Sequence, residues 1–64
     1  MAERILRRRA VEERVGKSRS TIYADMSKGN FPLPIKIGAR AVGWLESEVH
    51  DWIEARKAER EPAR

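Results

Sequence analysis

The chain of 64 residues contains no cysteine and a single histidine, His50. Without cysteine, neither a disulfide nor a thiolate metal site can stabilise the fold. His50 has no second ligand at metal-binding spacing, so we predict no metal site. A chain this short lies near the lower size limit for independent folding and depends on burying a few apolar side chains. The candidates for the core are Ile5, Leu6, Val11, Val15, Ile22, Met26, Phe31, Ile35, Ile37, Val42, Trp44, Leu45, Val49, Trp52 and Ile53.

The chain also lacks an apolar run of about 18 residues, the length that crosses a bilayer. Its N-terminal segment is rich in arginine and has no apolar stretch after it, which argues against a signal peptide. No cysteine nucleophile, phosphate-binding glycine-rich loop or carboxylate pair in a plausible cleft is present. So small a core leaves no room for an enclosed pocket of roughly 300–1,000 Å³. We therefore expect a cytoplasmic protein without enzymatic activity, cofactor or membrane contact.

Positive charge is concentrated in the first part of the chain. Residues 1–40 contain ten Lys and Arg against four Asp and Glu, a balance of +6, whereas residues 41–64 have a balance of −2. A basic half indicates a polyanionic partner, because phosphates supply most of the non-specific affinity in DNA binding. A basic surface that only keeps the protein in solution is the alternative.

A short helix is predicted over residues 8–15. Val11 and Val15 lie four residues apart and therefore share one face of this helix. Gly16 follows directly, at the position where a residue in the left-handed conformation ends a helix. Residues 3–7 precede the helix, are polar on both sides, and fit an edge strand or an extended lead-in.

A second helix is predicted to begin at Ser18, whose hydroxyl can accept a hydrogen bond from a backbone N–H two or three residues later. Ile22 and Met26 form its buried stripe, and Gly29 ends it. Only residues 16–17 separate the two helices, so the chain must turn sharply between them. This spacing predicts a helix-turn-helix.

Residues 31–34 include two prolines, which exclude a helix or a central strand there. Short strands are predicted at 35–37 and 41–44, joined by a glycine-containing loop into a tight hairpin. In this hairpin Lys36 and Arg40 point outward. The apolar side chains expected to reach the core are those of Ile35, Ile37, Val42 and Trp44.

A third helix is predicted over residues 46–59. Acidic residues crowd its first turns and basic residues come late, an order that suits the helix dipole. We interpret residues 1–64 as one winged helix-turn-helix domain, with frayed ends at 1–3 and 60–64.

The start of the second helix carries the most specific pattern in the chain. A helix that reads DNA needs short polar and basic side chains in its first turn, where it meets the groove. Arg19, Ser20, Thr21 and Tyr23 supply such side chains. We therefore predict a DNA-reading helix, with a helical hairpin whose polar turn faces water as the alternative.

Three residues depart from a typical helix-turn-helix. Glu12 stands where the first helix usually has a small residue. Lys17 occupies a turn position that is usually apolar, although its aliphatic stem can lie over the core. Asp25 places a negative charge on the predicted reading helix.

Three further groups each have two interpretations. The hairpin with Lys36 and Arg40 is either a wing that touches sugar-phosphate or a hairpin with solvated charges. Trp44 and Trp52 are interpreted as core, the alternative being platforms on which single-stranded bases stack. The run Arg7-Arg8-Arg9 either binds a phosphate at the start of the first helix or is a solvated tract.

One combination of motifs covers nearly the whole chain. It consists of Val15-Gly16, Ser18-Arg19-Ser20-Thr21-Ile22-Tyr23, Gly29 with Phe31-Pro32-Leu33-Pro34, the run from Ile37 to Trp44, and Ser47-Glu48-Val49 with Trp52-Ile53. With this combination, the chain from Arg4 to about Lys57 resembles the AlpA family of small prophage and mobile-element regulators. The resemblance implies an α+β fold, a small winged helix-turn-helix with three helices and a two-stranded hairpin wing, akin to excisionases and the DNA-binding part of the MerR group.

The resemblance also implies a DNA-binding surface. The residues predicted to bind DNA are Ser18, Arg19, Ser20, Thr21, Tyr23, Lys28, Lys36 and Arg40. Arg19 is the best candidate for reading a guanine edge. The family often has a basic and then an apolar residue where this chain has Ala24 and Asp25, so the packing behind position 25 must differ.

These features predict a sequence-specific regulator of transcription that binds duplex DNA and is of prophage or mobile-element type. One alternative is an excisionase, or recombination directionality factor, acting with an integrase. Another is a protein-interaction adaptor that uses the acidic third helix and does not bind DNA. One small module contacts little DNA, so a dimer or a cooperative array is expected. Integrase and RNA polymerase are the candidate protein partners, and a protein that binds DNA in this way is expected to be associated with the nucleoid.

Overall fold

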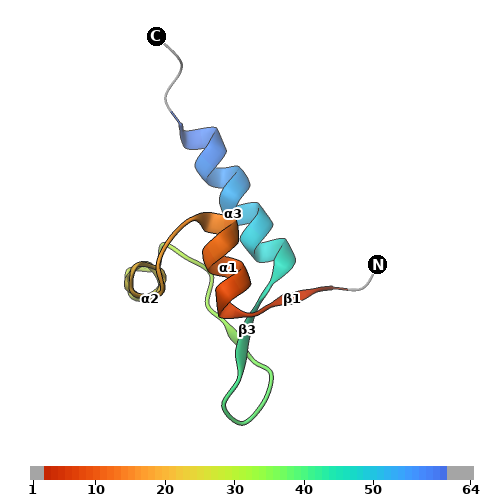
Figure 1. The fold of residues 1–64 in the computed structure, drawn as a ribbon. Helices are drawn as coiled ribbons and strands as arrows, with labels where there is room; N and C mark the ends of the chain where they lie inside the picture. The colour runs from red at the N-terminus through yellow and green to blue at the C-terminus, as the bar shows by residue number, and fades with distance from the viewer. Residues whose placement is uncertain (1–2, 61–64) are drawn as a thin grey trace.

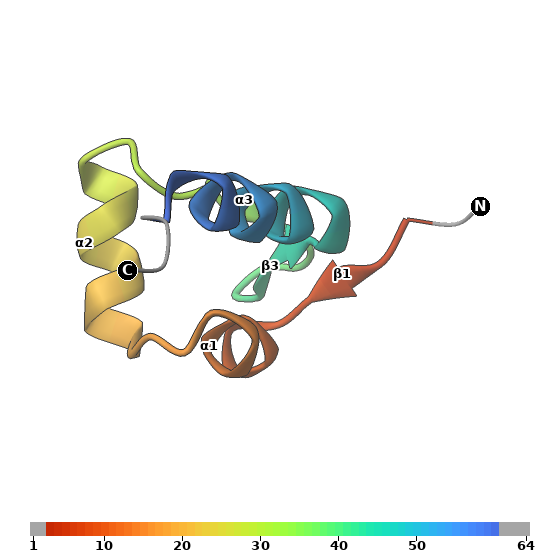
Figure 2. The same ribbon diagram turned by 90° about the horizontal axis from the view of Figure 1, so that it is seen from above.

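The computed structural model describes residues 3–60 and places three helices against a small antiparallel sheet (Figures 1 and 2). Within these residues the helices are α1 (Arg8–Val15), α2 (Arg19–Ser27) and α3 (Glu46–Glu59), and the strands are β1 (Ile5–Leu6), β2 (Ile35–Lys36) and β3 (Val42–Leu45). Figure 2 shows α2 lying crosswise to α1 and α3. This arrangement confirms the predicted α+β winged helix-turn-helix.

The turn between α1 and α2 forms as the sequence predicts. Gly16 adopts a left-handed conformation with φ 69°, and its N–H donates to the carbonyl of Glu12 at 2.8 Å, which ends α1. Ser18 is the N-cap of α2, and its Oγ accepts a hydrogen bond from the backbone N of Thr21 at 3.4 Å. Gly29, with φ 75°, follows the end of α2.

Strand β3 is the central strand of the sheet, with β1 on one edge and β2 on the other. Leu6 lies opposite Trp44 in the first pairing, and Lys36 lies opposite Val42 in the second. Directly opposite residues point to the same side of a sheet, and successive residues alternate. Leu6, Val42, Trp44 and Lys36 therefore share one face, and this face carries the core residues Leu6 and Trp44.

The expectation that Ile35 and Ile37 reach the core is wrong, whereas Lys36 is exposed as expected. The register places Lys36 on the face of Trp44, so its two neighbours lie on the opposite face. Ile35 and Ile37 are 38% and 39% exposed, and Ile5, also predicted to be core, is 42% exposed. Both residues of β2 are therefore exposed, and the hairpin contributes to the core through β3.

Each helix, β1, β3 and the segment after α2 contribute one buried side chain to the core. Its buried members are Leu6, Val11, Ile22, Phe31, Trp44 and Val49. The indole N–H of Trp44 donates to the carbonyl of Pro32 at 2.9 Å, and that of Trp52 donates to the carbonyl of Asn30 at 2.7 Å. Trp44 is fully buried and the half-buried Trp52 packs against the core, which confirms their interpretation as core residues.

The N-terminal segment binds the start of α3. Leu45 precedes this helix and has no side-chain acceptor to cap it. The Glu3 carboxylate takes that role, because it accepts hydrogen bonds from Ser47 N at 3.2 Å and Ser47 Oγ at 3.1 Å. Glu3 thus departs from the fraying expected at 1–3, whereas residues 1–2 and 61–64 of the expected frayed ends lie outside the described residues.

Within residues 3–60, no helix is both long and apolar enough to cross a membrane.

Candidate nucleic-acid interface

The first turn of α2 is exposed, and its hydroxyl groups have distinct roles. Ser18 Oγ lies 3.0 Å from Thr21 Oγ1 and 3.5 Å from Ser20 Oγ, while it also caps the helix. Ser18 and Thr21 therefore hold one another and fix the start of α2. Arg19 and Ser20 are exposed beside them and extend from the same turn. Directly behind this turn, Ile22 is fully buried and anchors α2 to the core.

Tyr23 lies between the core and the exposed turn of α2. Its ring packs edge-on against Trp44, with the centroids 6.4 Å apart and the planes at 72°. The guanidinium of Arg19 lies 5.8 Å from the centroid of the Tyr23 ring. Tyr23 remains 37% exposed, so it is supported by the core while still presenting its edge to solvent.

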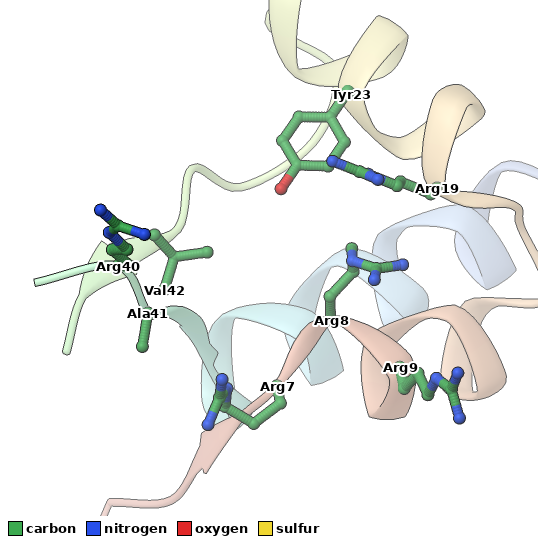
Figure 3. A pocket seen from close by; sticks show the side chains of 8 residues that line it. All are labelled: Arg7, Arg8, Arg9, Arg19, Tyr23, Arg40, Ala41 and Val42. Atoms are coloured by element: carbon green, nitrogen blue, oxygen red, sulfur yellow. The ribbon is translucent and has the colours of Figure 1, made fainter. Parts of the chain in front are cut away.

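A hollow of about 410 Å³ brings together residues from both helices of the helix-turn-helix and from the wing (Figure 3). The start of α1 contributes three consecutive arginines, α2 contributes Arg19 and Tyr23, and the β2–β3 hairpin contributes Arg40. The residues that line the hollow are Arg7, Arg8, Arg9, Arg19, Tyr23, Arg40, Ala41 and Val42. The fold thus gathers five arginines, separated by up to 33 positions in sequence, around one space.

Most of these arginines have no carboxylate partner among the described residues. Arg8 forms an ion pair with Glu12 one turn later in α1. Glu12, which stands where a helix-turn-helix usually has a small residue, thus serves as the partner of Arg8. Within residues 3–60, Arg7, Arg9, Arg19 and Arg40 form no ion pair. Like charges around one solvent-filled space repel, and an anion placed there would relieve this repulsion.

The other two unusual residues of the helix-turn-helix compensate one another. Lys17 Nζ in the turn lies 2.5 Å from a carboxylate oxygen of Asp25 in α2. The Asp25 side chain is only 17% exposed, and its negative charge is neutralised by Lys17. The same ammonium lies 5.2 Å from the centroid of the Trp52 ring, on which the Arg56 guanidinium also rests at 5.4 Å. Lys17 therefore connects the turn, α2 and α3.

The structure gathers only part of the predicted set around the arginine-lined hollow. Arg19, Tyr23 and Arg40 line it, while Ser18, Ser20, Arg19 and Tyr23 line a second hollow beside it on α2. Lys28 is exposed at the C-terminal end of α2, and Lys36 is exposed on β2, and neither lines these two hollows.

Sequence reasoning did not include the arginines at the start of α1 in the predicted site. The signal for them was present as the run Arg7-Arg8-Arg9, which had two open interpretations. What the sequence could not show is that the tip of the wing, with Arg40, folds back beside this run. That proximity follows from the pairing of both β1 and β2 with β3.

Comparison with known proteins places this chain in a family. Residues 4–57 match the family model described as prophage CP4-57 regulatory protein (AlpA). The chain is 36% identical over 61 residues to a protein of Escherichia coli (strain K12) named "DNA-binding transcriptional activator AlpA", with 86% of this chain and 87% of that protein covered. It is 47% identical over 58 residues to "Uncharacterized protein ORF88" of Enterobacteria phage P4, with 91% of this chain covered. The chain spans 66% of the length of this phage protein.

The family match covers the helix-turn-helix, the hairpin and most of α3. It therefore includes every residue that lines the two hollows on α2. The chain belongs to the AlpA family of prophage regulatory proteins.

Proposed function

We propose that this protein is a regulator of transcription, of prophage or mobile-element type, that acts by binding duplex DNA and has no enzymatic activity or cofactor. The observation that carries the proposal is the arginine-lined hollow beside the exposed first turn of α2. A reading helix flanked on one side by cationic groups is the arrangement that lets phosphate contacts position a helix in the major groove.

In this proposal α2 enters the major groove with its first turn. Arg19 and Ser20 are the exposed side chains best placed to meet base edges, and the Arg19 fork can pair with a guanine. Ser18 and Thr21 hold the helix start, and Tyr23 supports Arg19 from behind. Arg40 on the wing contacts the sugar-phosphate backbone, with Lys28 and Lys36 adding more distant positive charge.

The relatives support the regulatory part of the proposal. The Escherichia coli relative is named as a DNA-binding transcriptional activator, and the family description is that of a prophage regulatory protein. A single module of this size covers little DNA, so we propose that it binds as a dimer or as adjacent copies. Footprinting on the flanking genomic DNA tests the biological role. Protection over a promoter supports transcriptional control, whereas tandem sites beside an attachment site would instead indicate an excision factor.

The salt dependence of binding tests the proposal most directly. The log of the association constant for duplex DNA should fall linearly with the log of salt concentration. With roughly four to six phosphates contacted, the slope should lie near −4 to −5, at about −0.9 for each phosphate. Fluorescence anisotropy with a labelled duplex measures it. A slope near zero would refute DNA binding and favour a protein-interaction adaptor.

A further inference from the structure

The proposed function gives roles to α2 and to the wing, but it gives none to two arginines that line the arginine-lined hollow. Arg7 and Arg9 precede or open α1, outside the helix that reads bases and outside the wing. Neither forms an ion pair within the described residues, and both are exposed. Arg7 lines the same hollow as Arg40, which lies 33 positions later in the sequence.

The donors around this hollow come from three sides (Figure 3). Arg8 extends from the start of α1 and Arg7 from the residue just before it, Arg40 lies across from them on the wing, and the hydroxyl of Tyr23 points in from α2. Arg8 is paired with Glu12, and Arg19 lies over the Tyr23 ring. Of the arginines that form no ion pair within residues 3–60, Arg7 and Arg40 come from opposite sides of the hollow. A guanidinium presents its N–H groups as a planar fork that matches two oxygens of a phosphate.

The shape of the hollow favours a polymer backbone over a small free ion. It is open to solvent between α1 and the wing, and its volume of about 410 Å³ leaves room for the sugars on either side of a phosphate. The side chains of Arg7 and Arg40 are exposed, so both can reach a backbone phosphate that approaches from the solvent side.

We propose that this hollow is the site for one particular backbone phosphate of the bound DNA, held between Arg7 and Arg40 with the Tyr23 hydroxyl as a third donor. The inference rests on the proposed function, because the phosphate belongs to the duplex that α2 reads. Arg8 and Arg9 add positive charge beside it. A phosphate held on both α1 and the wing fixes how α2 enters the groove, since backbone contacts set the register of a reading helix.

Methylphosphonate scanning tests this assignment. A short duplex that contains the footprinted site is prepared with one neutral methylphosphonate at a time, and each version is titrated with the protein. The wild-type protein should lose about tenfold or more in affinity at one backbone position. Arg7→Gln and Arg40→Gln should each bind the unmodified duplex more weakly and lose most of the sensitivity at that same position.

Two further variants make the test specific. Arg4→Gln removes the same charge three residues away, from an exposed side chain that does not line the hollow, and should keep the full wild-type scan. Tyr23→Phe keeps the ring on Trp44 and removes only the hydroxyl. This variant should bind the unmodified duplex about three- to tenfold more weakly than the wild type. Its affinity should also depend less on a methylphosphonate at the same backbone position. Circular dichroism of each variant confirms that it is folded.

A titration with inorganic phosphate at constant ionic strength, followed by NMR, tests the alternative that the hollow binds free phosphate rather than a phosphate of the DNA backbone. We expect no saturable shift of the amides around the hollow below about 1 mM. Saturation in that range would make the hollow a free-anion site and overturn the backbone assignment. An Arg7→Gln scan identical to that of the wild type would overturn the inference while leaving DNA binding intact. Absence of any salt-dependent duplex binding would instead overturn both proposals.

Discussion

The pair of Lys17 and Asp25 offers a sharp test of how this helix-turn-helix is held together. The two side chains are 33% and 17% exposed, so their ion pair is neither fully solvated nor fully buried. Exposed pairs contribute about 0–1 kcal/mol, whereas loss of one partner from a buried pair costs about 3–5 kcal/mol. For Lys17→Met, which leaves the Asp25 charge unpaired, we expect unfolding to become easier by about 1–2 kcal/mol.

The paired substitution separates this interaction from simple packing. Methionine keeps a long unbranched apolar side chain at position 17, near the Trp52 ring on which the Lys17 ammonium lies, and Asp25→Ala removes the charge that Lys17 neutralises. The double variant should recover most of the stability lost by Lys17→Met, because no unpaired charge then remains. A double-mutant cycle by urea denaturation, followed through tryptophan fluorescence, measures a coupling expected to be about 1 kcal/mol.

If the changes in unfolding free energy of the two single variants add to that of the double variant within about 0.3 kcal/mol, this reasoning is refuted. Such additivity would mean that Lys17 acts only through its contact with Trp52 and that Asp25 is well solvated. As a control, the ion pair between Lys57 and Glu54 lies on an exposed face of α3, with side chains 54% and 48% exposed. Its cycle should give a coupling of no more than about 0.5 kcal/mol.

Three further predictions concern the core, the start of α3 and the reading helix. Trp44→Ala should cost about 3–5 kcal/mol and leave so small a domain largely unfolded, as circular dichroism would show; a folded variant that loses only DNA binding would contradict the core assignment. Glu3→Ala should lower the free energy of unfolding by about 1 kcal/mol, because it removes both acceptors at the start of α3; an unchanged urea midpoint would count against this cap. Arg19→Ala should reduce the binding free energy for the preferred duplex by about 1–3 kcal/mol and change that for a scrambled duplex little. Arg40→Ala should weaken binding to both duplexes equally and make the slope of log affinity against log salt shallower by about one. Equal losses for Arg19→Ala on both duplexes would make Arg19 a phosphate contact.

The end of α1 and the start of α2 are the part of the fold that the sequence alone determined best. Gly16 ends α1 because only a left-handed residue can close that turn cheaply, and Ser18 opens α2 because its hydroxyl reaches a nearby backbone N–H. These interactions span four residues or fewer, so the sequence of the segment contains all the partners. The exposed first turn of α2, with Arg19 and Ser20, was predictable for the same reason.

Tertiary structure decided which groups meet across the fold. Alternation along β2 is a local property, but its register with β3 decides which residues share the face of Trp44, and it put Lys36 rather than Ile35 on that face. Lys17 and Asp25 looked like two separate irregularities in the sequence, and the angle between the turn and α2 made them partners. The hollow between Arg7 and Arg40 depends on the whole sheet, because β3 must pair on both edges before the wing lies beside α1. Contacts between residues so far apart in sequence form only after the core has fixed the elements that carry them, so no local pattern encodes them.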